Sequence, residues 1–293
     1  MISNNNKWTP LVGWFVSMGL LGAAFFTIWN RWGDLTSAIV SIEHPNLWGL
    51  LALPLIMLIA IWFVSESFRQ LLNRSGMAKD GFAKIQRSEM FWLVLMAGML
   101  NWLPLRAGLI GRTVYHSKVN GIPATKSLRV LLEVIVLTIC MSGVAFLLTG
   151  VSSVSNIQLV FLLVVPVFVL GLFSIKTDTR PWSVAIICRY FDVLLLAMRY
   201  WIIFGLIGFD ITPETAILLA GAGTVSGLLP LPTGGLGGRE WIIGFVASWV
   251  TVFPAAIALG LVADLINRVV ELVVVVPLGL LGQRFIREKI SHS

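Results

Sequence analysis

Long runs of apolar residues dominate the chain, and short polar segments separate them. A helix needs about 20 consecutive apolar residues to cross the hydrocarbon core of a bilayer. The segments 47–68, 128–149 and 254–282 meet that length, and residues 11–29 form an apolar run that we interpret as a retained first helix. We therefore predict an all-α polytopic membrane protein.

The composition agrees with this interpretation. Of the 293 residues, 57% are hydrophobic and 12% are charged, a balance that excludes a water-soluble domain of this size. We expect a single transmembrane domain over residues 1–293. The net charge of +7 comes from Lys and Arg between or at the ends of the apolar segments. It favours contact with an anionic inner leaflet, and nucleic acid is not an expected partner.

The distribution of charge over the polar segments predicts the topology. Residues 69–89 contain five Lys or Arg and two acidic residues, the positive excess that is typical of a cytoplasmic loop. The loop with Asp210 and Glu214 has no basic residue and is predicted to be external. Both termini are then predicted to be cytoplasmic.

Two apolar segments are too short to cross and end at a proline. Residues 90–103 stop at Pro104, and residues 215–229 stop at Pro230. A full crossing by the first would place the basic stretch 106–129 outside, against the positive-inside rule. A re-entrant hairpin keeps these charges on the entry side and explains the short length. We predict about six full transmembrane helices plus two re-entrant helical hairpins.

The two breaks share a sequence pattern. Residues 103–112 and 229–239 both fit Leu-Pro-Leu-x-x-Gly-x-x-Gly followed by Arg. Because the hairpins enter from opposite faces, we expect an inverted-topology repeat with halves of roughly 47–173 and 183–283. Proline ends the first arm of each hairpin, and glycine lets the backbone turn. The predicted hairpin tips contain Asn101, Pro104, Gly108, Pro230, Gly234, Gly235 and Gly237.

Charged residues also lie inside the predicted spans. Asp264, Arg268 and Glu271 follow one another at spacings of four and three, which places them on one helical face. Arg189 and Asp192 are three residues apart in another span, and Arg199 follows seven residues later. Such groups either form structural ion pairs between helices or line a substrate path. Because ionisable residues inside a membrane are by default candidates for a functional site, we favour the second interpretation.

These residues give a candidate site for an anionic ligand. A helix N-terminus and a guanidinium group both favour phosphate or carboxylate. The predicted head-group-binding arginines are Arg106, Arg112, Arg189, Arg239 and Arg268. The carboxylates that would hold these arginines or carry protons are Glu133, Asp192, Glu240, Asp264 and Glu271.

Enzyme chemistry is not expected. The three histidines, His44, His116 and His292, are predicted in loops or the tail, so no span supplies a base for Ser226. The two cysteines have no Cys or His neighbour at metal-ligand spacing, and the chain has no Gly-rich nucleotide loop. We predict no catalytic residue, no metal and no cofactor.

The residues Asn101…Pro104-x-Arg106-x-Gly108…Arg112 and Pro230…Gly234-Gly235-Leu236-Gly237-x-Arg239-Glu240 resemble the lysylphosphatidylglycerol synthase transmembrane-domain family. This flippase-like module also occurs in multiple peptide resistance factors and in standalone proteins of glycolipid and hopanoid pathways. The resemblance runs from about the first hairpin to the end of the chain. Members often carry Glu directly after the glycine of the first hairpin, where this chain has Leu109.

The resemblance implies movement of an anionic or glycosylated lipid between leaflets, with the head group in a central cavity. We expect a standalone member without the soluble synthase domain, which does not aminoacylate lipid itself. The leading hypothesis is an inner-membrane lipid translocase for an anionic or polyprenyl-phosphate-linked lipid. The alternatives are a non-transporting accessory subunit of a glycosyltransferase or lipid-modifying enzyme, and an ion-coupled small-anion carrier or channel.

Overall fold

The computed structural model describes residues 8–30, 32–33, 47–74, 77, 82, 84–102, 107–150, 164, 167, 171, 179–228, 237–252 and 255–291. Over these ranges the chain is helical, with short turns, and contains no strand. The prediction of an all-α protein is confirmed for this part of the chain. The helices are α1 (Trp8–Asn30), α3 (Leu47–Leu72), α4 (Arg87–Leu100), α5 (Ala107–Val119), α6 (Ala124–Gly150), α8 (Arg180–Leu206), α9 (Pro213–Leu228), α10 (Gly238–Val250) and α11 (Ala256–Ser291).

Three of the described helices are long and apolar enough to cross a membrane: Trp48–Leu72, Ala124–Leu148 and Arg180–Leu206. The sequence predicted about six. The segment expected to cross at 254–282 forms helix α11 from Ala256 onward, and this helix contains Asp264, Arg268 and Glu271. Helix α1 (Trp8–Asn30) covers the first helix that was predicted at 11–29. The segment 157–173 lies largely outside the described residues.

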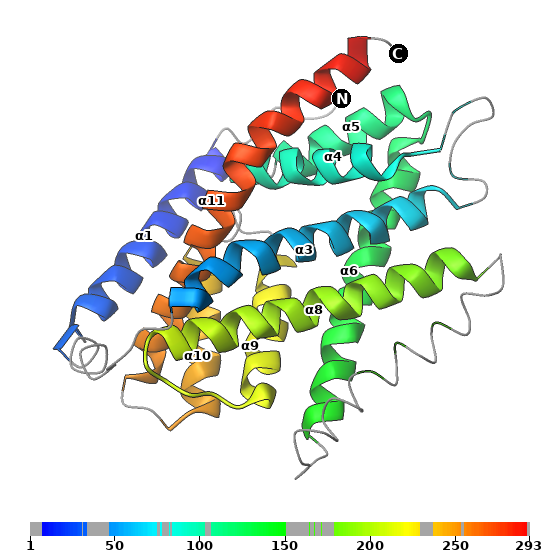
Figure 1. Ribbon diagram of the computed structural model, residues 1–293. Helices are drawn as coiled ribbons and strands as arrows, with labels where there is room; N and C mark the ends of the chain where they lie inside the picture. Colours follow the sequence, from blue (N-terminus) through cyan, green and yellow to red (C-terminus); the bar gives the residue numbers. More distant parts are fainter. Residues whose placement is uncertain are drawn as a thin grey trace.

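At each shared motif one described helix ends and the next begins, and we call these two places the first and second break. The first break separates α4 from α5, and these two helices pack against each other. The second separates α9 from α10, which also pack together. Figure 1 shows α4 and α5 beside the C-terminal part of α11, and α9 and α10 at the opposite end of the molecule. Helices α3 and α8 lie side by side between them.

Helix α11 holds the two pairs of short helices together through close glycine contacts. A Cβ atom on Gly260 would lie 2.7 Å from the Cα of Gly244, so the backbones of α11 and α10 nearly touch. A Cβ atom on Gly279 would lie 2.8 Å from the Cβ of Met99 on α4. Small residues allow this approach between helices where lipid removes the hydrophobic driving force.

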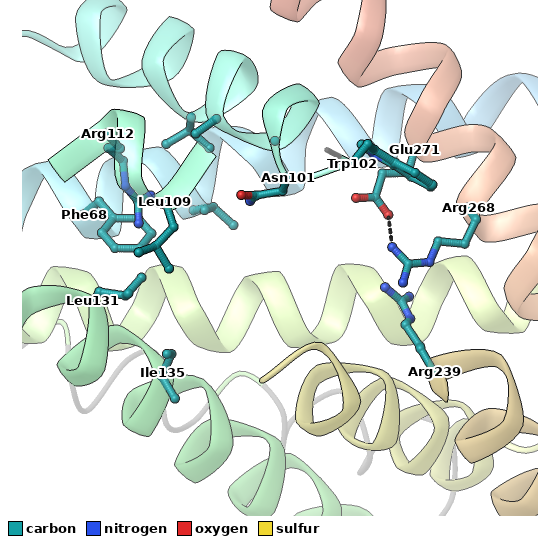
Figure 2. Close-up of a pocket in the computed structure, with 14 residues that line it drawn as sticks. Phe68, Asn101, Trp102, Leu109, Arg112, Leu131, Ile135, Arg239, Arg268 and Glu271 are labelled. Atoms are coloured by element: carbon teal, nitrogen blue, oxygen red, sulfur yellow. Dashed lines mark ion pairs between the residues drawn. The ribbon is translucent and has the colours of Figure 1, made fainter. Parts of the chain in front are cut away.

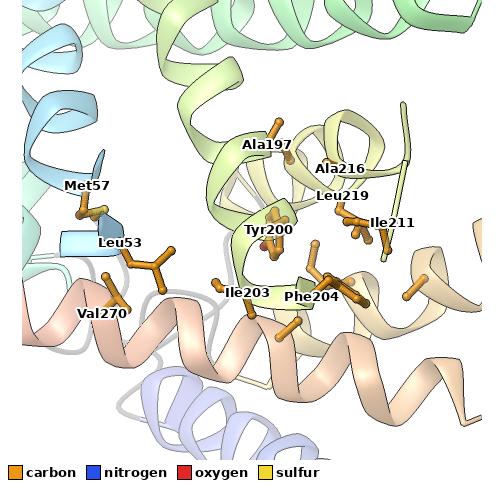
Figure 3. Close-up of a cluster of buried hydrophobic side chains, with 14 of the residues drawn as sticks. Leu53, Met57, Ala197, Tyr200, Ile203, Phe204, Ile211, Ala216, Leu219 and Val270 are labelled. Carbon is orange, nitrogen blue, oxygen red and sulfur yellow. The ribbon is translucent and has the colours of Figure 1, made fainter. Parts of the chain in front are cut away.

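The larger apolar core lies beside these contacts. It joins α3, α8, α9, α10 and α11, and its fully buried side chains include Leu53, Tyr200, Phe204, Leu219 and Ile243. Figure 3 shows Tyr200 and Phe204 of α8 facing Leu219 and Ile211. This core fixes α8 against α9, the helix that precedes the second shared motif.

The glycine contact between α10 and α11 predicts a stability difference between two similar substitutions. Gly260→Ala forces a methyl group against backbone, and overpacking of this kind costs about 1–3 kcal/mol. Gly205→Ala on the exposed face of α8 meets nothing within 4 Å and serves as the matched control. Thermal unfolding in detergent measures both variants. Equal stability of the two would contradict the close packing of α11 on α10.

Candidate functional site

A cavity of about 350 Å³ lies between the α4–α5 pair, the start of α10 and the long helices. Residues from the first break, from α10 after the second break, and from α3, α6 and α11 surround it (Figure 2). The lining consists of Val64, Phe68, Val94, Ala97, Gly98, Asn101, Trp102, Leu109, Arg112, Leu131, Ile135, Arg239, Arg268 and Glu271. The cavity therefore combines an apolar wall with three arginines and one carboxylate.

Arg112 provides the positive charge at one end of the cavity. Its guanidinium carbon lies 3.9 Å from the centroid of the Phe68 ring, a cation–π contact. No carboxylate of the described residues lies within 4.0 Å of its nitrogens. A guanidinium group with five donors and no carboxylate beside it is suited to an incoming anion.

Arg239 belongs to a buried network at the other end of the cavity. Its Nη2 lies 3.1 Å from Oδ1 of Asp264, and the Tyr200 hydroxyl donates a hydrogen bond of 2.6 Å to the same oxygen. The Arg239 Nη2 also donates to the Tyr200 hydroxyl at 3.3 Å. Asp264 is fully buried, so these two partners compensate a charge that water does not reach.

Arg268 bridges two carboxyl groups that differ in exposure. Its Nη1 lies 3.6 Å from Oε2 of Glu271, which lines the cavity. Its Nε lies 3.7 Å from Oε1 of Glu240, which is fully buried behind the cavity. The guanidinium group also lies 5.3 Å from the centre of the Trp102 ring. At this end of the cavity, basic side chains (Arg239 and Arg268) therefore alternate with acidic side chains (Asp264, Glu240 and Glu271).

Of the predicted charges on α8, Arg189 and Arg199 are buried and Asp192 is partly exposed, and none of them lines the cavity. Arg189 donates hydrogen bonds to the Ser67 hydroxyl at 2.9 Å and to Asp192 at 3.1 Å. Arg199 contacts the sulfur of Met57 at 2.6 Å and has no described carboxylate within 4.0 Å. Arg189 therefore joins α8 to α3 through Ser67, whereas its ion pair with Asp192 lies within α8.

Glu133 also lies outside the cavity lining. Its Oε2 lies 2.9 Å from Nη1 of Arg74, and its Oε1 lies 3.0 Å from Nε of Arg129. These contacts tie α6 to the end of α3. The structure does not bring Glu133 together with the other predicted carboxylates.

The predicted tip residues divide into two groups. Asn101 lines the cavity, and its buried Oδ1 has no hydrogen-bond partner among the described residues. A Cβ atom on Gly108 would clash with the carbonyl oxygen of Ala97, so glycine is required where α5 meets α4. Gly237 has a φ of 84° before α10, a conformation that favours glycine. The remaining residues lie outside the described residues: Pro104, Arg106, Pro230, Gly234 and Gly235.

Several side chains at the site were not predicted. Phe68 and Trp102 place aromatic rings against Arg112 and Arg268, and Tyr200 completes the network around Asp264. Trp102 directly follows Asn101 in the sequence, which is a signal that could have identified it. Apolar lining residues such as Leu131 carry no such signal, because lipid-facing residues have the same character.

The predicted position of His116 in a loop is wrong. His116 lies in α5 and is fully buried, with Nδ1 2.9 Å from Oδ1 of Asn120. Burial lowers the pKa of His116 to about 4, so its imidazole is neutral at pH 7. It does not line the cavity, and it adds no base there.

A second polar cluster, around Glu89, was also not predicted. The Glu89 carboxylate accepts hydrogen bonds from Tyr115 at 3.0 Å, from Asn120 at 2.9 Å and from Lys289 at 2.7 Å. Burial raises the pKa of Glu89, but the hydrogen bonds from Asn120 and Lys289 outweigh it and hold the pKa below its usual value. The cluster fixes the base of the α4–α5 pair to the end of α11.

Comparison of the chain with protein-family models, with curated proteins and with solved structures finds no match. The resemblance to the lysylphosphatidylglycerol synthase transmembrane-domain family therefore rests on the motif residues and stays a prediction.

The Arg239–Asp264 pair predicts a non-additive effect on stability. Arg239→Ala leaves the buried Asp264 carboxylate without its cation, and loss of one partner of a buried pair costs about 3–5 kcal/mol. Adding Asp264→Asn removes the uncompensated charge, so the double variant should unfold at a higher temperature than Arg239→Ala. A double variant that is less stable than Arg239→Ala would contradict this electrostatic account.

Proposed function

We propose that this chain is an inner-membrane lipid translocase. It moves an anionic lipid, or a polyprenyl-phosphate-linked or glycosylated lipid, between leaflets. The observation that carries the proposal is Arg112, a cation without a described carboxylate partner on the wall of a cavity between the two breaks. A volume of about 350 Å³ lies within the range of small-molecule sites, about 300–1,000 Å³, and is suited to a head group.

The proposed architecture has about six full spans and two re-entrant hairpins in a bacterial inner membrane, with both termini cytoplasmic. Its support is helix length, because α4, α5, α9 and α10 have 14, 13, 16 and 13 residues, fewer than a crossing needs. In this arrangement α4–α5 enters from the cytoplasmic face and α9–α10 from the opposite face. The repeat would let the two halves open the cavity to each side in turn.

The cavity has separate surfaces for the two parts of a lipid, the phosphate and the lipid chains. Arg112, Arg239 and Arg268 are the groups that would bind the phosphate. Helices α5 and α10 begin at their breaks, and the positive ends of their dipoles favour the same charge. Phe68 and Leu131 provide apolar surface beside Arg112, along which the lipid chains would leave toward the bilayer.

The proposal predicts that Arg112 is needed for transport and dispensable for folding. Arg112→Ala leaves no carboxylate unpaired, in contrast to Arg239→Ala. Loss of a charged hydrogen bond of about 1.5–3 kcal/mol should slow translocation by roughly 10- to 100-fold. Proteoliposomes with a fluorescent phosphatidylglycerol or a fluorescent polyprenyl-phosphate sugar, quenched from outside, measure the rate. Arg180→Ala, at the exposed start of α8, is the matched control.

Translocation by Arg112→Ala at the wild-type rate would contradict the proposed role of the cavity. If the wild-type protein moves neither probe and purifies with a glycosyltransferase in equal amounts, the accessory-subunit hypothesis replaces this one.

A further inference from the structure

Glu240 is a fully buried carboxyl group that lacks hydrogen-bond donors. Neither of its oxygens accepts a hydrogen bond from any described residue. Its contact with Arg268, at 3.7 Å, is longer than a hydrogen bond. A glutamate in the first turn of a helix interacts favourably with the helix dipole, which accounts for its place in α10. The dipole does not replace the missing donors, and a charged carboxylate in this setting is costly.

Asp264 is equally buried but has the opposite environment. Its Oδ1 accepts a hydrogen bond from Tyr200 and lies 3.1 Å from Arg239. Two carboxyl groups at one end of the cavity therefore differ in how well their charged forms are stabilised. Asp264 has a hydrogen-bond donor and a cation close to it, whereas Glu240 has only a longer contact with Arg268.

Arg268 connects Glu240 to the cavity. Its guanidinium group lies between Glu240 and the more exposed Glu271, at 3.7 and 3.6 Å, and itself lines the cavity. An anion that enters beside Arg268 competes with Glu240 for this cation. When the guanidinium group turns to the anion, the charged form of Glu240 loses that stabilisation.

The other charged groups that face Glu240 come from few elements. Arg239 precedes it on α10, and α11 contributes Asp264 and Arg268. Helix α9 has one ionisable residue, Glu214, in its first turn and away from the break, and α1 has none. Arg268 is thus the charged group that both contacts Glu240 and lines the cavity. A ligand in the cavity acts on the charge of Glu240 through Arg268.

We propose that Glu240 takes up one proton when an anionic head group binds in the cavity, so that the lipid and the proton are carried together. This inference rests on the proposed function and deepens it. On binding, an O–H bond forms on the Glu240 carboxylate with a proton from water, and Arg268 shifts to the anion. On release, the proton returns to water and Arg268 returns to Glu240. The net charge of the site stays constant, since one negative charge enters and one proton neutralises another.

The experiment is calorimetric titration of the full-length protein in detergent with dioctanoyl phosphatidylglycerol. Parallel titrations in two buffers of different ionisation enthalpy give the number of protons taken up per lipid. The wild-type protein should take up close to one proton near neutral pH. Its affinity should rise as the pH falls, by up to about tenfold for each pH unit.

Glu240→Gln should bind the lipid without proton uptake and with an affinity that does not depend on pH. Asp210→Asn, in an exposed loop, is the matched control and should behave as the wild type does. Glu240→Asp keeps the carboxyl group and should keep the proton uptake, over a shifted pH range. If Glu240→Gln does not fold, this shift of the pH range tests the assignment to Glu240 instead.

Wild-type binding without proton uptake and with constant affinity would overturn the coupling and leave the proposed translocase intact. Full uptake in Glu240→Gln would overturn the assignment to Glu240. Absence of lipid binding by the wild-type protein would instead overturn the proposed function, and the coupling with it.

Discussion

The buried pair of Arg239 and Asp264 is the interaction on which the rest of the site depends. A carboxylate that water does not reach must have its charge compensated, and Asp264 obtains this from Arg239 and Tyr200. These three residues lie on α10, α11 and α8, so the pair fixes the start of α10 against two long helices. The start of α10 thereby keeps its position relative to α8 and α11.

Helix α11 connects the Arg239–Asp264 pair to the α4–α5 pair at the first break. Glycine contacts bring it close to α10 at Gly260 and to α4 at Gly279, and Lys289 pairs with Glu89 at the base of the α4–α5 pair. Between these contacts lies Arg268, at the cavity. One helix therefore connects both breaks, and a movement at either break would act on the same charged groups. Arg112 differs from them because no described carboxylate holds it.

The sequence predicted the helices well, because apolar runs, prolines and glycines report on local structure. It also identified Arg112, Arg239, Arg268 and Glu271, since charges inside apolar segments are conspicuous. It did not predict which charges would meet: Glu133 pairs with Arg74 and Arg129 away from the cavity. Partner choice depends on how helices distant in the sequence pack, and one-dimensional spacing does not contain that information. The cluster around Glu89 and the buried position of His116 were missed for the same reason.

Native mass spectrometry of the protein extracted from its own membrane, with identification of the lipids that remain bound, tests the central claim most directly. A cavity built for an anionic head group should retain one specific phospholipid or polyprenyl-linked sugar per chain, and Arg112→Ala should lose it. Retention of bulk membrane lipid alone, in equal amounts by both proteins, would contradict a lipid site at this cavity.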